Sequence, residues 1–307
     1  MDKLYDVIVL GGGPAGYTAA LYSTRSGLDT AVIEKFSAGG QMTQTSQIDN
    51  YPGFDDGVDG FTLGFKMQSA AEKFGAITIR DEILGVNFDD KIKKVNTSAG
   101  TLYGKSVIIA MGADHRHLGI ENEDTLIGRG VGYCATCDGM FYKGKTVAVI
   151  GGGNSACSDA LYLSKICSKV YIVHRRDSLR ATKIYHEPLL KAKNIEFVWN
   201  SNCVEFVYGE KIEKIKLQNT ITREISELNC DGVFISIGRN PQTDIFKDII
   251  DIDSSGYIIA DESTKTNIPG VFAAGDIRTK VLRQIVTAAS DGAVAAHHAE
   301  EYIAKNF

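Results

Sequence analysis

Two cysteines in the middle of the chain, Cys134 and Cys137, have the spacing of a redox pair. Thiols separated by two residues can close a small ring and exchange two electrons as a dithiol or a disulfide. The alternative for a CxxC segment is half of a zinc site, but no second CxxC or histidine pair lies at finger or ribbon spacing. The spacing therefore favours redox chemistry, and we expect no metal site.

An acid follows the pair directly. Asp138 could give protons to the two thiols and take them back, because an acid–base group must lie within hydrogen-bond reach of the reacting atoms. A role in a turn or a helix cap is the other interpretation of a lone acid in a loop. The remaining cysteines show no pairing spacing and are expected to be core or surface residues. They are Cys157, Cys167, Cys203 and Cys230.

Length and composition describe a globular chain long enough for two domains. It has 307 residues, of which 44% are hydrophobic and 23% charged, with a formal net charge of -5. This balance gives no basic footprint for nucleic acid. The N-terminus lacks the order of a signal peptide, and no apolar run reaches membrane-spanning length. We therefore expect a cytoplasmic protein with no nucleic-acid or membrane partner, in which a disulfide would be catalytic.

The chain begins with the pattern of a dinucleotide-binding unit. An apolar run over 5–10 predicts a buried parallel strand, and a helix is predicted over 17–26. Between them, G-x-G-x-x-G spacing permits a tight turn and close approach of the backbone to a pyrophosphate. A second strand, 30–33, leads to Glu34, which could accept hydrogen bonds from a ribose with a free 2′-hydroxyl. The loop consists of Gly11, Gly12, Gly13, Pro14, Ala15 and Gly16.

The same pattern repeats 140 residues later, between strands predicted over 146–150 and 170–173. At the position of Glu34 the repeat has a histidine followed by arginines, which fit a 2′-phosphate better than a 2′-hydroxyl. We therefore expect FAD at the first loop and NADPH at the second; the alternative is an ordinary solvated basic cluster. The second loop consists of Gly151, Gly152, Gly153, Asn154, Ser155 and Ala156, and the cluster of His174, Arg175, Arg176 and Arg180.

A third glycine-rich segment lies near the C-terminus. Strands are expected over 256–259 and 268–274, the second leading into a turn at Gly275 and Asp276, and a helix is expected over 284–305. A helix N-terminus just after a strand end favours negative charge, such as that of a reduced flavin ring or of its phosphate oxygens. A purely structural turn is the alternative.

Four segments together resemble those of bacterial low-molecular-weight thioredoxin reductases, and the resemblance spans nearly the whole chain. They are 134–139, the second glycine loop, 174–180 and 269–276. The resemblance implies an α/β homodimer whose chains each have two Rossmann-like, three-layer nucleotide-binding domains. An FAD domain, 1–114 and 244–307, would be interrupted by an NADPH domain, 115–243, that carries the redox pair.

The resemblance also implies a route for electrons. Hydride would pass from NADPH to FAD, electrons would pass to the Cys134–Cys137 disulfide with Cys137 as the flavin-facing sulfur, and the dithiol would reduce thioredoxin or a thioredoxin-like protein. Nicotinamide and disulfide cannot both contact one flavin ring at once. We therefore expect the inserted domain to rotate about hinges near 113–118 and 238–244.

Further flavin contacts are implied by the resemblance alone. They are Lys35, Gly39, Gly40, Gln41, Thr45, Asn50, Ala110, Gly112, Gly275, Asp276, Arg283, Gln284 and Ile285. The chain departs from the family pattern at Met111, where threonine is usual and a packing contact beside the flavin would change. It departs again at 157–159, where Cys-Ser-Asp replaces a more usual acidic pair.

Three other functions stay open. The reductase of a peroxide-reducing system would carry an extra N-terminal thiol domain, for which the start at Met1 leaves no room. A ferredoxin-fed relative would need no 2′-phosphate site, so the basic cluster argues against it. A non-turnover redox sensor would oxidise NADPH stoichiometrically rather than catalytically.

Overall fold

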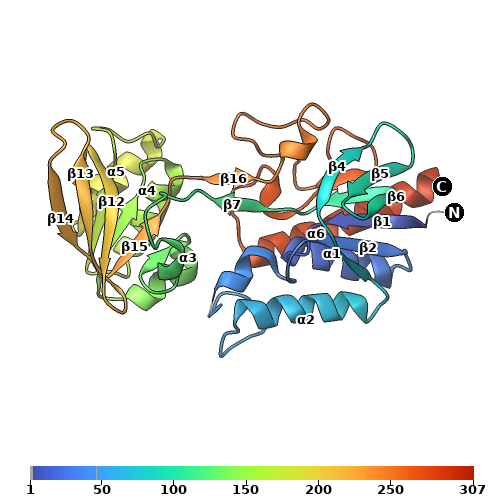
Figure 1. Cartoon of the computed structure of the whole chain (residues 1–307), viewed down its shortest axis with the longest axis horizontal. Coiled ribbons are helices and arrows are strands. Elements are labelled where there is room, and N and C mark those ends of the chain that lie inside the picture. The colour runs from blue at the N-terminus through green and yellow to red at the C-terminus, as the bar shows by residue number, and fades with distance from the viewer. Residues whose placement is uncertain (1–2, 46) are drawn as a thin grey trace. The chain divides into compact units, whose positions relative to one another are not determined.

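The computed structural model describes residues 3–45 and 47–307, which divide into two units. Unit 1 consists of Met1–Asp114 and Asn240–Phe307, and unit 2 of His115–Arg239. The chain therefore returns from unit 2 to unit 1 after Arg239, a few residues earlier than the boundary after 243 that the sequence led us to expect. Unit 2 is thus inserted into the chain of unit 1 (Figure 1).

Unit 1 is organised around one large sheet with the strand order β3-β2-β1-β6-β5-β4, in which β17 also pairs with β6. Neighbours among β3, β2, β1, β6 and β17 pair in parallel, whereas β4 and β5 add an antiparallel extension. The strands are β1 (Leu4–Leu10), β2 (Thr30–Glu34), β3 (Ile77–Arg80), β4 (Ile83–Asn87), β5 (Lys93–Thr97), β6 (Gly100–Ile109) and β17 (Val271–Ala273).

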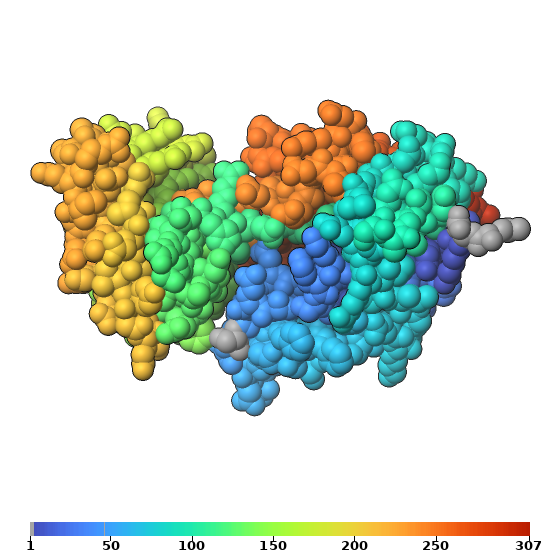
Figure 2. All heavy atoms as spheres, in the orientation of Figure 1, coloured from blue at the N-terminus to red at the C-terminus, as the bar shows by residue number. Residues whose placement is uncertain are grey.

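The parallel sheet of unit 1 is buried on both faces, which explains the uninterrupted apolar run of β1. Val7 and Val9 face one hydrophobic cluster, shared with the helices α1 (Pro14–Arg25), α2 (Gly60–Glu72) and α6 (Ile285–Asn306). Ile8 and Leu10 alternate with them and face a second cluster on the other side. The unit is therefore a three-layer α/β structure, and in the space-filling view side chains close the gaps between its ribbons (Figure 2).

Unit 2 has a five-stranded parallel sheet in the order β11-β10-β9-β15-β8 and a separate antiparallel sheet, β12-β13-β14. Helices pack on one face of the parallel sheet and the antiparallel sheet on the other, again giving three layers. The strands are β8 (Val131–Gly132), β9 (Thr146–Ile150), β10 (Lys169–Val173), β11 (Ile195–Val198), β12 (Ser201–Tyr208), β13 (Ile212–Asn219), β14 (Ile225–Asn229) and β15 (Gly232–Ile235). The helices are α3 (Ala135–Asp138), α4 (Asn154–Ser164) and α5 (His186–Lys191).

One predicted strand is wrong. Residues 256–259 contribute only isolated bridges, from Ile258 to Ile252 and to Arg278, because a turn at Gly256 with φ of +92° interrupts the extended backbone. The C-terminal helix is where the pattern predicts it, with Gln284 as its N-cap. The two crossings, β7 (Ala113–His115) and β16 (Arg239–Pro241), pair with each other as a two-stranded sheet. No helix in the described part of the chain combines the length and apolar character that a membrane span requires.

Candidate functional site

The first glycine loop joins β1 to α1 and has close backbone contacts at three glycines. A side chain at Gly11, where φ is +100°, would place its Cβ 2.6 Å from the carbonyl oxygen of Ala110, and one at Gly16 would lie 1.9 Å from the oxygen of Gly11. At Gly12 the amide donates to the Glu34 carboxylate over 2.6 Å. Space is open only at Gly13, where an added Cβ would meet nothing within 4 Å.

The second glycine loop joins β9 to α4 and has the same construction. Gly151 has φ of +148°, and a Cβ there would lie 2.4 Å from the carbonyl oxygen of Ser236. A Cβ at Gly152 would lie 2.5 Å from the imidazole of His174, and Gly153 again opens onto free space. Buried Ala156 stands where the first loop has its last glycine.

Both loops are suited to hold a phosphate group. No described side chain caps α1 or α4, whose N-caps are Gly13 and Gly153, so their first backbone N–H groups are available to an anion. The open space in front of each glycine is where a pyrophosphate can approach the backbone. The residues present therefore fit a dinucleotide at each loop.

His174 and the arginines that follow it form the basic end of the second site. The imidazole is buried, and its Nε2 is a buried nitrogen with no hydrogen-bond partner. Burial, and then the nearby guanidinium groups of Arg175, Arg176 and Arg180, lower the pKa of His174. The three arginines themselves are exposed. Their charges are therefore free to meet an anionic group of a ligand.

Several expected flavin contacts converge on the first loop. The amide of Gly39 donates to the carbonyl of Gly12 over 2.8 Å, and a Cβ at Gly40 would lie 3.5 Å from Cα of Gly13. Asn50 Nδ2 donates to Gln284 Oε1 over 3.1 Å, which joins the loop before α2 to the N-terminus of α6. Also in unit 1 are Ala110, Gly112 with φ of +74°, Gly275, Asp276 and Ile285.

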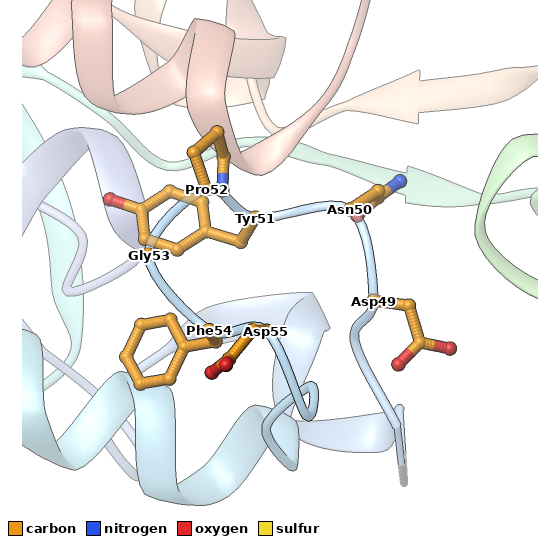
Figure 3. Close-up of a pocket in the computed structure, with 7 residues that line it drawn as sticks. All are labelled: Asp49, Asn50, Tyr51, Pro52, Gly53, Phe54 and Asp55. Carbon is orange, nitrogen blue, oxygen red and sulfur yellow. The ribbon is translucent and has the colours of Figure 1, made fainter.

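The segment 49–55 lines an open hollow of about 530 Å³ in unit 1. The rings of Tyr51 and Phe54 lie on one side of it and Asn50 on the other (Figure 3). Both rings are half-buried against a small hydrophobic cluster that also includes Ile285. The hollow therefore belongs to the same part of unit 1 as the expected flavin contacts.

Four of the expected contacts are engaged with the protein itself. Lys35 Nζ lies 2.7 Å from Glu82 Oε1. Gln41 Nε2 donates to the carbonyl of Ala113, Thr45 accepts the amide of Gly60 over 2.9 Å, and Arg283 lies over the ring of Tyr257 at 4.1 Å. The Lys35 ammonium is accordingly directed to a neighbouring carboxylate.

Met111, half-buried, packs against the second hydrophobic cluster of unit 1.

The cysteine pair forms a disulfide at the start of a short helix in unit 2. Cys134 is the N-cap of α3, and its Sγ accepts the amide of Cys137 over 3.2 Å. The two sulfurs are bonded at 2.06 Å, and both residues are partly exposed. The expectation that the pair forms a disulfide is confirmed. Within the described ranges, no group of three or more His, Cys, Asp or Glu could hold a metal ion.

Asp138 ends the helix that carries the disulfide. Burial raises the pKa of its carboxyl to about 6. A Cβ added at Gly132 on β8 would lie 3.2 Å from its Oδ2, so a side chain there would crowd the carboxyl. A carboxyl with this pKa can both hold and release a proton near neutral pH, which is the property that an acid–base partner of the thiols needs.

Tyr133, directly before Cys134, belongs to a network of polar side chains that the sequence did not predict. The Tyr133 hydroxyl donates to Glu123 Oε1 over 2.5 Å and lies 3.0 Å from His117 Nδ1. Buried Glu123 also accepts the amides of Leu118 and Gly119. Burial, together with Glu123, raises the pKa of Tyr133. The only signal in the sequence was the tyrosine next to the cysteine.

The comparisons with known proteins agree with this geometry. A family model described as pyridine nucleotide-disulphide oxidoreductase matches residues 5–292. A Listeria innocua protein named thioredoxin reductase is 46% identical over 98% of this chain and 95% of its own length. Thioredoxin reductase from Streptococcus pyogenes is 41% identical and superposes with a TM-score of 0.93, covering 99% of this chain and 100% of its own. The Lactococcus lactis enzyme in its FR conformation is also 41% identical, with coverage of 98% and 99% and a TM-score of 0.68.

These matches extend over nearly the full length of the chain and include both glycine loops and the disulfide. The chain therefore belongs to the pyridine nucleotide-disulphide oxidoreductase family, and within that family to the thioredoxin reductases. It is an oxidoreductase with a disulfide centre, and its family implies a flavin and a nicotinamide cofactor. The expected α/β fold with two Rossmann-like domains is confirmed.

Proposed function

We propose that this chain is an NADPH-dependent, FAD-containing thioredoxin reductase that reduces thioredoxin or a thioredoxin-like protein. Unit 1 would bind FAD and unit 2 NADPH. The observation that carries the proposal is the combination, in one chain, of two phosphate loops of matching geometry with a disulfide spaced by two residues. FAD and NADPH, when bound, would supply the two electrons that the disulfide takes up.

The protein's own part of the reaction is carried by two sulfurs. Two electrons and two protons convert the Cys134–Cys137 disulfide into two thiols. One thiolate then attacks the partner's disulfide and forms a mixed disulfide, and the second cysteine attacks that bond, which releases the reduced partner and restores the intramolecular bond. Asp138 would supply and recover protons, because its carboxyl changes charge near neutral pH.

The assignment of coenzymes is supported by the residue that lies over the second glycine of each loop. In unit 1 this residue is Glu34, an acceptor for ribose hydroxyls. In unit 2 it is His174, and three exposed arginines follow within six residues. Exposed guanidinium groups bind a phosphate in a bidentate manner, whereas an acid in that place would repel it.

The spectrum of the purified protein tests this proposal. We expect bound flavin whose visible absorbance bleaches on addition of NADPH and returns on addition of oxidised thioredoxin, with continued NADPH consumption. NADH should be a much poorer reductant. Protein without flavin would contradict the cofactor assignment, and consumption that stops after one equivalent of NADPH would favour a redox sensor.

Rotation of unit 2 during turnover stays a prediction, as do the homodimer and the cytoplasmic location expected from the sequence. Two solved relatives, each 41% identical to this chain, support the rotation. Their TM-scores of 0.93 and 0.68 over nearly complete chains indicate that relatives adopt more than one conformation. A covalent cross-link between the two units should slow thioredoxin reduction strongly. An unchanged rate in the locked protein would show that rotation is unnecessary.

A further inference from the structure

A buried cluster of charges lies beneath the turn that follows β17. Asp291, on α6, is 5% exposed, and Arg278 is 1% exposed. The Arg278 guanidinium donates to both carboxylate oxygens of Asp291, from Nε over 2.9 Å and from Nη2 over 2.8 Å. Lys280, whose side chain is 5% exposed, donates to Asp291 Oδ2 over 2.7 Å. One buried carboxylate therefore holds two buried cations.

The same carboxylate also holds the backbone of the turn. The amide of Gly275 donates to Asp291 Oδ2 over 2.9 Å. Burial alone would raise the pKa of Asp291, but the hydrogen bonds from Arg278 and Lys280 outweigh it and keep the pKa below its usual range. Asp291 is therefore a charged acceptor that joins α6 to the backbone amide of the turn.

The turn and α6 both pack closely against the start of α1, the helix that follows the first glycine loop. A Cβ at Gly275, where φ is +79°, would lie 3.0 Å from Cβ of Ala15, and one at Gly292 would lie 2.2 Å from the Ala15 carbonyl oxygen. The turn, the first residues of α1 and the second turn of α6 thus meet at one residue. A shift of the turn would change the space beside the phosphate loop, since glycine contacts this short leave no slack.

We propose that Asp291, braced by Arg278 and Lys280, is a positioning residue that fixes the Gly275–Asp276 turn against the first glycine loop in the conformation that receives FAD. The inference rests on the proposed FAD site in unit 1. Asp291 need not touch the cofactor. It acts through the Gly275 amide and through the two cations that it holds in place.

The test compares Asp291→Asn with Glu262→Gln. Glu262 also accepts from Arg278, over 3.2 Å, but its side chain is 92% exposed, which makes it a matched control. For Asp291→Asn we expect FAD affinity, measured by titration of the apoprotein, to fall at least tenfold, with a changed shape of the flavin absorbance band. The rise in melting temperature that FAD produces should also shrink. Glu262→Gln should match the unaltered protein in all three measurements.

Each other outcome has a definite meaning. FAD affinity and spectrum within twofold of the unaltered protein would overturn the inference. So would a lower melting temperature of the apoprotein with an undiminished rise on adding FAD, since that pattern indicates a purely structural role. If Asp291→Asn does not fold, Lys280→Met decides the question by the same measurements. Failure of the unaltered protein to bind FAD would instead contradict the proposed function.

Discussion

The two glycine loops are nearly the same piece of backbone with a different residue placed over the second glycine. Their N-cap glycines have φ/ψ of -80°/-173° at Gly13 and -93°/-177° at Gly153. The amide of Gly11 donates to the carbonyl of Ile33 over 2.9 Å, and the amide of Gly151 donates to the carbonyl of Val173 over 3.0 Å. In each loop the first glycine is thus bonded to the end of the second strand. Over the second glycine, unit 1 has the carboxylate of Glu34 and unit 2 the imidazole of His174.

The difference shows which part of such a loop is general and which part is selective. The glycines provide a turn and a helix N-terminus, which bind any pyrophosphate. In the proposed sites the side chains after the second strand would meet the adenosine ribose, where the carboxylate of Glu34 and the arginines after His174 have opposite preferences. Selectivity between nucleotides therefore depends on few residues that can be exchanged without disturbing the loop.

The largest expected effect separates the disulfide from both nucleotide sites. Cys134→Ser or Cys137→Ser should abolish thioredoxin turnover, because a lone thiol cannot regenerate the intramolecular disulfide. Flavin binding and reduction by NADPH should persist, since neither cysteine belongs to a glycine loop. Stopped-flow absorbance measures flavin reduction by NADPH, and a thioredoxin assay measures turnover. Cys167→Ala, a buried cysteine in the same unit, is the control, and turnover in either serine variant would remove the pair from the mechanism.

Removing two of the three arginines of the second site should reduce its difference from the first. In the double variant Arg175→Gln/Arg176→Gln, we expect NADPH binding to weaken by roughly 1.5–3 kcal/mol for each charged hydrogen bond lost. NADH binding should change little. Steady-state kinetics with both coenzymes measure the preference, and Lys211→Gln, an exposed cation elsewhere in unit 2, is the control. An unchanged preference would place the 2′-phosphate elsewhere.

The corresponding change in the first site is expected to be smaller. Glu34→Ala removes one carboxylate, the acceptor of the Gly12 amide and of the Phe36 amide. FAD binding should weaken by roughly 1.5–3 kcal/mol, the range for one hydrogen bond to a charged group. Titration of the apoprotein with FAD measures this loss. Asp90→Ala, which removes an exposed carboxylate elsewhere in unit 1, should leave FAD affinity unchanged; equal losses in both variants would argue against a specific role of Glu34.

The smallest effect concerns stability rather than binding. The pKa of Asp138 is about 6 in the folded chain, against a usual 3.8, so the folded state binds this proton more tightly than the unfolded state does. The stability of the unaltered protein should therefore fall as pH rises from about 4 to above 6, by at most about 3 kcal/mol from this group. Asp138→Asn should lose that part of the pH dependence. Melting temperatures across this range measure it, and parallel curves for the two proteins would contradict the shift.

The features that the sequence predicts well are those with a local cause. Glycine spacing between an apolar strand and a helix has one physical explanation, so both loops could be located and their second strands placed within one or two residues. The strand predicted over 256–259 failed because an apolar run does not reveal the turn at Gly256, where φ is +92°, and only isolated bridges form at Ile258. Which charged side chains become buried depends on contacts far apart in the chain.

Asp291 is a charged residue whose burial depends on contacts far apart in the chain, although the helix pattern gave a weak indication of it. It lies on the same helical stripe as Ala288, Ala295 and Ala299, all of which are buried. An acid on an apolar stripe requires a buried cation, because an unpaired charge in the core is costly. The partners, however, come from the turn before α6 and could not be identified from the helix pattern. The network at Tyr133 and Glu123 was hidden for the same reason.

The four cysteines outside the redox pair are buried, free thiols. Burial raises the pKa of Cys157 and Cys167 to about 11 and that of Cys203 and Cys230 to about 12. At neutral pH, roughly one such thiol in ten thousand or fewer is ionised, and only the ionised form attacks a disulfide. Burial and raised pKa values thus disfavour exchange between the Cys134–Cys137 pair and the chain's other thiols.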